Sequence, residues 1–358
     1  WGLQNGGNGK VGLWILRPVV YFVLTAFVTY QLVRTPRQAK WLLMAMLVCI
    51  GIRAAATMVL WWQQRGTGVY HESYVAHENT SFALYLVWMA FGAFMLKISK
   101  PLGTLVFLLL PITLLAVMFN DRRINFVTLV LGCVVMVVAM PRLALARRTI
   151  WLMAGTVALM LYLAAAVVLP VNGLTRPVDG ILTGLRSEVR GHYTDSSSEY
   201  RKQERYNLIH TIRAYPLMGA GLGVAYLQPI PLPDLGYAYS KLIPHNQVLG
   251  THALMGPQGY FMLLLFHIAL LVQMLSCYRR LKTDWHRLLA LVAACSVINW
   301  LVVGYYDIQL FYFRNNLFMA VVVALPAALM HWQEEQEHRD HGLVLFQPRQ
   351  QASDRFLA

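Results

Sequence analysis

The sequence has little charge: only 13% of its 358 residues are Asp, Glu, Lys or Arg, and 58% are hydrophobic. A soluble globular domain carries about 25% charged residues, so this composition excludes a soluble enzyme and a disordered chain. Cysteine is also scarce, and no disulfide or zinc spacing is present, which excludes a secreted disulfide scaffold. The cysteines lie in or at the ends of apolar runs and are interpreted as small buried hydrophobes: Cys49, Cys133, Cys277 and Cys295.

Apolar runs of about 20 residues recur along the chain, and each is long enough to cross the hydrocarbon core of a bilayer, which is about 30 Å thick. The runs are unbroken and do not alternate as the strands of a membrane barrel do. We therefore predict an all-α, polytopic membrane protein, a bundle of spanning helices. Its nine predicted spans lie at 11–33, 41–62, 81–98, 101–119, 125–141, 150–171, 257–278, 287–306 and 313–332.

The basic residues predict how the chain crosses the membrane. The short connections after the first, third, fifth and seventh spans hold twelve Lys and Arg residues, against four in the intervening short connections. Because Lys and Arg concentrate in cytoplasmic loops, the first set faces the cytoplasm and the long connection faces the outside, which is the periplasm in a bacterial inner-membrane protein. Residue 1 then lies outside, and we expect an odd number of further spans before it in the native chain. The net charge of +14 has the same origin, so we predict contacts with membrane lipids and not with nucleic acid.

The chain divides into four predicted regions. They are a membrane region of six spans, a long periplasmic loop with the candidate catalytic residues, a membrane region of three spans and a polar cytoplasmic tail: 1–171, 172–256, 257–332 and 333–358. Within the loop, Leu208, Ile209 and Ile212 give residues 199–214 an apolar stripe, and Pro216 ends it. We expect an amphipathic helix at the outer membrane surface.

Arg122 and Arg123 break the charge pattern, because they lie on a short connection predicted to face the periplasm. A guanidinium group stays charged and can donate two parallel hydrogen bonds to phosphate oxygens. The pair is therefore a candidate for holding the diphosphate headgroup of a lipid. The alternative is an ordinary interfacial contact with bulk lipid headgroups.

Arg201 and Arg205 are four residues apart and share one face of the predicted loop helix. They are candidates for the same diphosphate. By themselves they are better explained as part of a solvated helix face, with Glu199 and Glu204 neutralising their charge.

His245 and Asn246 stand near the end of the long loop, where a lipid-linked substrate would present its headgroup. Histidine is the side chain whose ordinary pKa best suits base catalysis near neutral pH. His245 is therefore the candidate catalytic base, with Asn246 and His252 as supporting residues. A structural histidine in a loop is the competing interpretation.

No metal or cofactor is predicted. The sequence has no HExxH motif, no carboxylate pair typical of glycosidases and no acidic pair placed to hold Mg²⁺ on a nucleotide. The glycines of MGAGLG lack the strand–helix context of a dinucleotide loop, so we expect only a tight turn there: Gly219, Gly221 and Gly223. A reaction between lipid-borne substrates needs neither metal nor nucleotide.

Three motifs in order along the chain carry a family resemblance. Residues 245–259 resemble the H-N-x-x-L-x6-G-x-x-G pattern of the O-antigen ligase and polymerase superfamily, with the fixed positions at His245, Asn246, Leu249, Gly256 and Gly259. The stretch RYNLIHTIRAYPLMGAGLG at 205–223 resembles that superfamily's segment ending in P-L-x-G-x-G, and the basic pair at 122–123 resembles its first arginine position. The likeness covers roughly 120–260 and the flanking spans, and it is strongest toward the O-antigen ligases.

The resemblance implies an enzyme of the bacterial inner membrane. O-antigen ligases move a polysaccharide from undecaprenyl diphosphate to the outer-core sugar of lipid A-core on the periplasmic side, without metal or ATP and with inversion at the anomeric centre. Carried onto this sequence, His245 would deprotonate the acceptor hydroxyl, and the arginines would hold the diphosphate. The family architecture has about twelve spans, which implies three spans before residue 1.

Two other classes of function stay open. A polymerase or a protein-glycan ligase of the same superfamily would use the same donor with a different acceptor. A transporter of lipid-linked glycan would use arginines in its cavity but would not need His245.

The predicted periplasmic position of 172–256 can be tested by chemical labelling. The cysteine of a Ser197→Cys variant should react with a membrane-impermeant thiol reagent in intact spheroplasts. The parent protein is the matched control, because its four cysteines lie in or at the ends of apolar runs. Labelling that appears only after lysis would overturn the orientation and put the candidate site in the cytoplasm.

Overall fold

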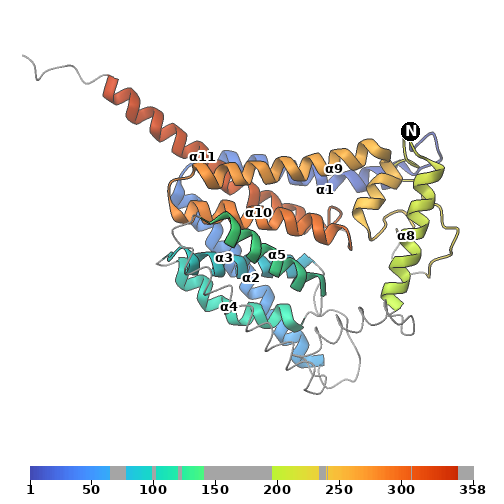
Figure 1. The fold of residues 1–358 in the computed structure, drawn as a ribbon, viewed down its shortest axis with the longest axis horizontal. Coiled ribbons are helices and arrows are strands. Elements are labelled where there is room, and N and C mark those ends of the chain that lie inside the picture. The colour runs from blue at the N-terminus through green and yellow to red at the C-terminus, as the bar shows by residue number, and fades with distance from the viewer. Residues whose placement is uncertain are drawn as a thin grey trace, which may run out of the picture.

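The computed structural model describes residues 1–64, 78–98, 102–119, 123–140, 196–233, 239, 241–307 and 309–345 (Figure 1). In these ranges every regular element is a helix, which confirms the predicted all-α class. The helices are α1 (Gly9–Leu32), α2 (Pro36–Gln64), α3 (Glu78–Met95), α4 (Leu102–Phe119), α5 (Arg123–Ala139), α8 (Ser196–Ala214), α9 (Gln247–Arg280), α10 (Asp284–Gly304) and α11 (Phe313–Leu345).

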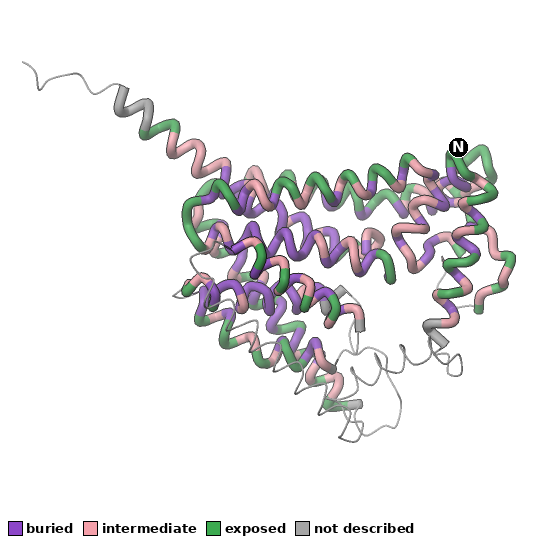
Figure 2. The backbone as a smooth tube through the Cα atoms, viewed as in Figure 1, coloured by how far each residue is buried: buried purple, intermediate pink, exposed green. Residues whose placement is uncertain are grey.

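Five of these helices, α1, α2, α9, α10 and α11, are long and apolar enough to cross a membrane. Shorter apolar helices occur in α3, α4 and α5. Eight of the nine predicted spans thus coincide with helices, while the predicted span 150–171 lies outside the described residues. The faces of α1 and α9 that point away from the bundle expose large apolar side chains, as expected where a helix meets lipid (Figure 2).

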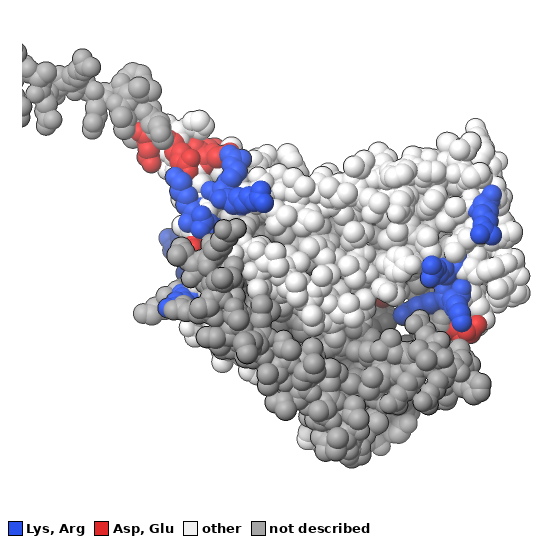
Figure 3. Space-filling view, in the orientation of Figure 1, with Lys and Arg blue, Asp and Glu red and all other residues white. Residues whose placement is uncertain are grey.

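Charge is unevenly distributed on the face of the molecule drawn in Figure 3. In Figure 3, Lys and Arg side chains gather at the two ends of the molecule and leave a broad uncharged belt between them. One end carries Arg280, the last residue of α9, and Lys282 in the turn that follows, and the other carries Arg201 and Arg205 of α8. The apolar belt is consistent with a bilayer core flanked by polar headgroups.

The contacts along α10 establish which helix ends coincide. Asn299, near the end of α10, donates to the Ser81 hydroxyl near the start of α3 (3.2 Å). Leu288, near the start of α10, lies against Gly92 near the end of α3. The two helices are therefore antiparallel, and α3 begins where α10 ends.

Helix α5 runs in the same direction as α3. The indole Nε1 of Trp88 donates to the carbonyl of Leu129 (3.3 Å), and one turn later Gly92 lies against Met136. Small residues such as Gly92 allow this close packing between apolar helices. Arg123, the first residue of α5, therefore lies at the same end of the bundle as the start of α3 and the end of α10.

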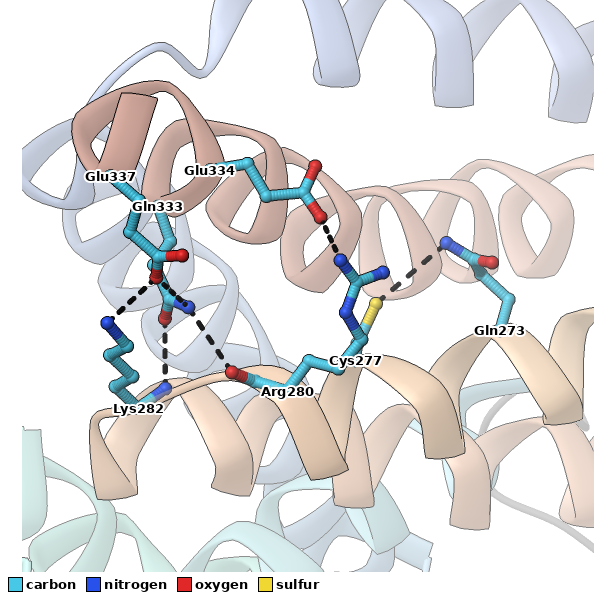
Figure 4. Close-up of polar contacts among 7 residues, drawn as sticks. All are labelled: Gln273, Cys277, Arg280, Lys282, Gln333, Glu334 and Glu337. Atoms are coloured by element: carbon cyan, nitrogen blue, oxygen red, sulfur yellow. Dashed lines mark hydrogen bonds and ion pairs between the residues drawn. The ribbon is translucent and has the colours of Figure 1, made fainter. Parts of the chain in front are cut away.

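Helix α11 is longer than the sequence predicted. The polar tail was expected to begin at residue 333, but the helix continues to Leu345 and its last turns project beyond the bundle (Figures 1 and 2). Figure 4 shows the reason: Gln333 and Glu337 of α11 bind the turn after α9, through the backbone N–H and the Nζ of Lys282 (2.9 Å each). Arg280 pairs with Glu334 beside them. These contacts extend an otherwise polar helix out of the apolar core.

Helix α9 contains the predicted span 257–278 and begins before it, at Gln247. It is kinked at Gly256, whose φ of 70° and ψ of −171° are not helical, so the predicted span starts directly after the kink. Pro257 follows and has no N–H to offer the carbonyl of Ala253. The backbone N–H of Ala220 donates to that carbonyl instead (2.8 Å).

The glycine-rich turn of 219–223 brings the backbone donors to the carbonyls at the kink. Gly221 N–H donates to the carbonyl of Leu254 (2.9 Å), next to the bond from Ala220. A Cβ added to Gly219 would stand 2.5 Å from the backbone nitrogen of Gly256, and Gly219 itself has a φ of +69°. The sequence prediction of a tight turn at MGAGLG is confirmed, and the turn is shaped to fit the kink.

The fit between the turn and the kink predicts a large effect of a single methyl group. Gly219→Ala should lower the melting temperature of the purified protein, because it adds a backbone clash to a left-handed conformation that by itself costs roughly 1–3 kcal/mol. Gly6→Ala is the matched control: Gly6 has a φ of +76°, but a Cβ there would meet nothing within 4 Å. A Gly219→Ala loss no larger than the Gly6→Ala loss would show that the two segments are not tightly packed.

Candidate functional site

His245 lies directly before α9 and is held by the carboxylate of Glu204 in α8. The backbone N–H of His245 donates to both carboxylate oxygens at 3.1 Å, and its ring Nδ1 is 3.1 Å from Oε1 of the same carboxylate. The Glu204 side chain is 2% exposed, whereas the His245 side chain is 22% exposed. A buried carboxylate thus fixes both the backbone and the ring of a solvent-accessible histidine.

Helix α8 presents Glu204 on its buried face. Its buried residues recur at helical spacing: Tyr200, Glu204, Asn207, Leu208 and Thr211. Asn207 pairs with the backbone of Ile230 through both its amide nitrogen (2.7 Å) and its oxygen (3.1 Å). Thr211 accepts from the backbone N–H of Leu227 (2.9 Å). These polar contacts bind the chain after the glycine turn along α8.

Two tyrosines complete the surroundings of the carboxylate. The Tyr226 hydroxyl donates to Oε1 of Glu204 (3.4 Å). Tyr200 places its ring at 83° to the imidazole of His245, with the ring centroids 5.3 Å apart. Burial and the charge of Glu204 raise the pKa of Tyr200 to about 12, against the opposing effect of a hydrogen bond with Tyr226. Tyr200 therefore stays a protonated phenol even well above physiological pH.

Asn246 and Gln247 fix the start of α9. Asn246 is the N-cap of the helix, and its Oδ1 accepts from the backbone N–H of Leu249 (2.9 Å). The Oε1 of Gln247 accepts from the backbone N–H groups of Gln309 (2.9 Å) and Leu310 (2.6 Å), in the connection from α10 to α11. Asn246 thus caps the helix that begins beside His245, and its supporting role in catalysis stays a prediction.

His252 has a different environment from His245. It lies farther along α9, and its ring is 5.5 Å from that of Tyr260, tilted by 32°. This contact bridges the kink at Gly256. The predicted support of His252 for catalysis is not tested by this packing contact.

Of the four predicted arginines, the structure describes the side chains of Arg201 and Arg205 and the backbone of Arg123. Arg201 and Arg205 stand beside the buried stripe of α8, Arg201 half-buried and Arg205 exposed, and the basic side chains of this end are visible in Figure 3. Arg123 begins α5 at this end, although its side chain is outside the described residues, as is the whole of Arg122. Arg201 and Arg205 in α8 and His245 before α9 therefore lie on two segments that contact each other. The backbone of Arg123 lies at the same end of the bundle.

Sequence reasoning missed the role of Glu204. It was assigned to neutralise neighbouring arginines, but its carboxylate turns into the protein toward His245 and Tyr226. Its position within the repeat of buried residues was the available signal, since a carboxylate on the apolar face of a helix needs a buried partner. Gln247 was missed as well, because its partners come from residues 62 and 63 positions away.

Within the described part of the chain, no group of three or more His, Cys, Asp or Glu residues is placed to hold a metal ion. The chemistry that these residues can perform is proton transfer at His245 together with binding of an anion by the arginines. Both would act at one end of an apolar bundle.

The model of a family described as O-antigen ligase matches residues 105–264, from α4 to the part of α9 beyond its kink. No curated protein matches the sequence. Over these residues the chain is similar to the O-antigen ligase family, which supports a place in the O-antigen ligase and polymerase superfamily.

Proposed function

We propose that this protein is an O-antigen ligase (WaaL), a glycosyltransferase that moves a polysaccharide from undecaprenyl diphosphate to lipid A-core. The observation that carries the proposal is the contact of His245 with buried Glu204, inside the segment that matches the O-antigen ligase family. The family match supports glycosyl transfer of the O-antigen ligase or polymerase type, and the choice of lipid A-core as acceptor is the finer part of the proposal.

In the proposed reaction His245 acts as the general base. It takes the proton from the acceptor hydroxyl, whose oxygen attacks the anomeric carbon of the donor sugar. The bond from that carbon to the diphosphate oxygen breaks, and undecaprenyl diphosphate leaves with the bonding electrons. Attack opposite the leaving group inverts the anomeric centre. General base catalysis contributes typically about 10²- to 10⁴-fold to such a step.

The arginines supply the second component of the proposal. Arg201 and Arg205, with Arg122 or Arg123, bind the diphosphate in the ground state and offset the negative charge that grows on it as the bond breaks. The half-buried position of Arg201 beside the stripe that holds Glu204 favours it as a direct contact. Because a lipid diphosphate is already an activated leaving group, the reaction needs neither a metal ion nor ATP.

The proposed location follows from the same donor. The protein would sit in the bacterial inner membrane with the end that carries α8 facing the periplasm. There the lipid-linked donor and the lipid A-core acceptor both present their sugars just above the bilayer.

The division of labour between base and arginines can be measured on purified variants, in EDTA and without ATP. His245→Ala should lower transfer by at least about 10²-fold and leave donor binding intact, because proton transfer occurs only in the reaction. At least one variant of each arginine pair, Arg122→Ala or Arg123→Ala and Arg201→Ala or Arg205→Ala, should also weaken donor binding. Lysine at that position should rescue poorly, since it keeps the charge but loses the paired hydrogen bonds.

The matched controls are His210→Ala and Arg213→Ala, two exposed residues of α8 outside the proposed site, which should leave transfer and binding unchanged. Near-normal transfer by His245→Ala would make His245 structural. A requirement for Mg²⁺ would contradict the metal-free mechanism. A lengthened lipid-linked glycan would identify a polymerase, and transport without any covalent product would identify a transporter.

A further inference from the structure

We infer that Glu204 is a positioning residue for the proposed base: its buried carboxylate holds the His245 ring in the tautomer with the proton on Nδ1 and the lone pair on Nε2. The inference rests on the proposed function of His245. It adds an assignment for a residue that the sequence motifs leave out.

Hydrogen-bond chemistry determines the tautomer. An ionised carboxylate can only accept hydrogen bonds, and a neutral imidazole carries a single N–H. Because Nδ1 of His245 lies 3.1 Å from Oε1 of Glu204, Nδ1 is the donor and the lone pair of the neutral ring is on Nε2. The backbone N–H of His245 and the hydroxyl of Tyr226 also donate to this carboxylate, so three donors converge on it.

The use of a carboxylate here exceeds a purely structural need. A backbone N–H at a helix start is satisfied by a neutral oxygen, as Asn246 shows for Leu249 one turn later. Glu204 is 1% exposed, and burying a charge is unfavourable unless it is paired. A negative charge at this position becomes useful when the ring gains a proton, because the imidazolium then lies against it.

A positioning role for Glu204 and a role in donor binding predict different effects on the kinetics. The ring of His245 becomes positive only after it takes the acceptor proton, so the carboxylate stabilises the transition state more than the bound donor. Removing its charge should therefore lower kcat while leaving donor affinity unchanged. A residue that only held α8 in place would disturb both.

The first test compares Glu204→Gln with Glu199→Gln. Glutamine keeps the size of Glu204 and an oxygen for the His245 backbone, but it removes the charge. We expect kcat to fall at least about tenfold with donor affinity unchanged; loss of the carboxylate charge in a serine-protease triad costs about 10⁴-fold. Glu199 lies on the same helix and contacts Gln203 (3.2 Å), so Glu199→Gln should leave kcat unchanged.

The second test reads the tautomer without any substrate. Protein labelled with ¹⁵N-histidine is measured by NMR at about pH 8, where an ordinary imidazole is neutral. The signals of His245 are those absent from His245→Gln. The unmodified protein should show a protonated Nδ1 and an unprotonated Nε2, and Glu204→Gln should show a mixture of tautomers.

Different outcomes of the two tests contradict the positioning role of Glu204 and the catalytic role of His245. A proton on Nε2 of His245 in the unmodified protein would overturn the inference, and so would an unchanged kcat and tautomer in Glu204→Gln. A changed tautomer with unchanged transfer would support the positioning contact and refute His245 as the base. If Glu204→Gln does not fold, the spectrum of the unmodified protein still decides the tautomer, and Glu204→Asp supplies the kinetic comparison.

Discussion

The arrangement of the site depends on satisfying the backbone of α9 where the helix bends. Gly256 and Pro257 prevent the helix from pairing its own carbonyls, and unpaired carbonyls are costly in apolar surroundings. The turn of 219–223 supplies the missing donors, and its glycines allow the two backbones to meet. The bend and the turn therefore require each other. Together they release residues 247–255 from the long span, so that the start of α9 stands at the end of the bundle beside α8.

Two independent ties then fix α8 against α9. The glycine turn that follows α8 binds the carbonyls of the kink, and Glu204 binds the residue that precedes α9. Between these two points the contacts of Asn207 and Thr211 hold the connecting chain along the helix. The result is a polar corner on an otherwise apolar bundle, with a buried carboxylate and a more exposed histidine at its centre.

The sequence predicted the parts of this structure that depend on local composition. The apolar runs located the helices, and the stripe of Leu208 and Ile212 located α8, because hydrophobic periodicity is a local signal. It failed where a distant segment decides the outcome. Residues 247–255 join the predicted span 257–278 through a kink whose carbonyls bind the distant turn of 219–223, and α11 continues past the predicted span 313–332 where Gln333 and Glu337 bind the α9–α10 turn. Neither contact can be read from local composition. His245 was found from a motif, whereas Glu204 required the fold.

The clamp made by Gln247 has a consequence for the kind of acceptor that can react. Its oxygen joins the residue two positions after His245 to the connection between α10 and α11, two helices that are both long and apolar enough to cross the membrane. The position of the histidine relative to α10 and α11 is thereby set by the bundle. Under the proposed function, the site would select among lipid-anchored glycans by distance. The reacting hydroxyl would have to lie at one fixed distance from the lipid anchor of the acceptor, before any feature of the sugar is recognised.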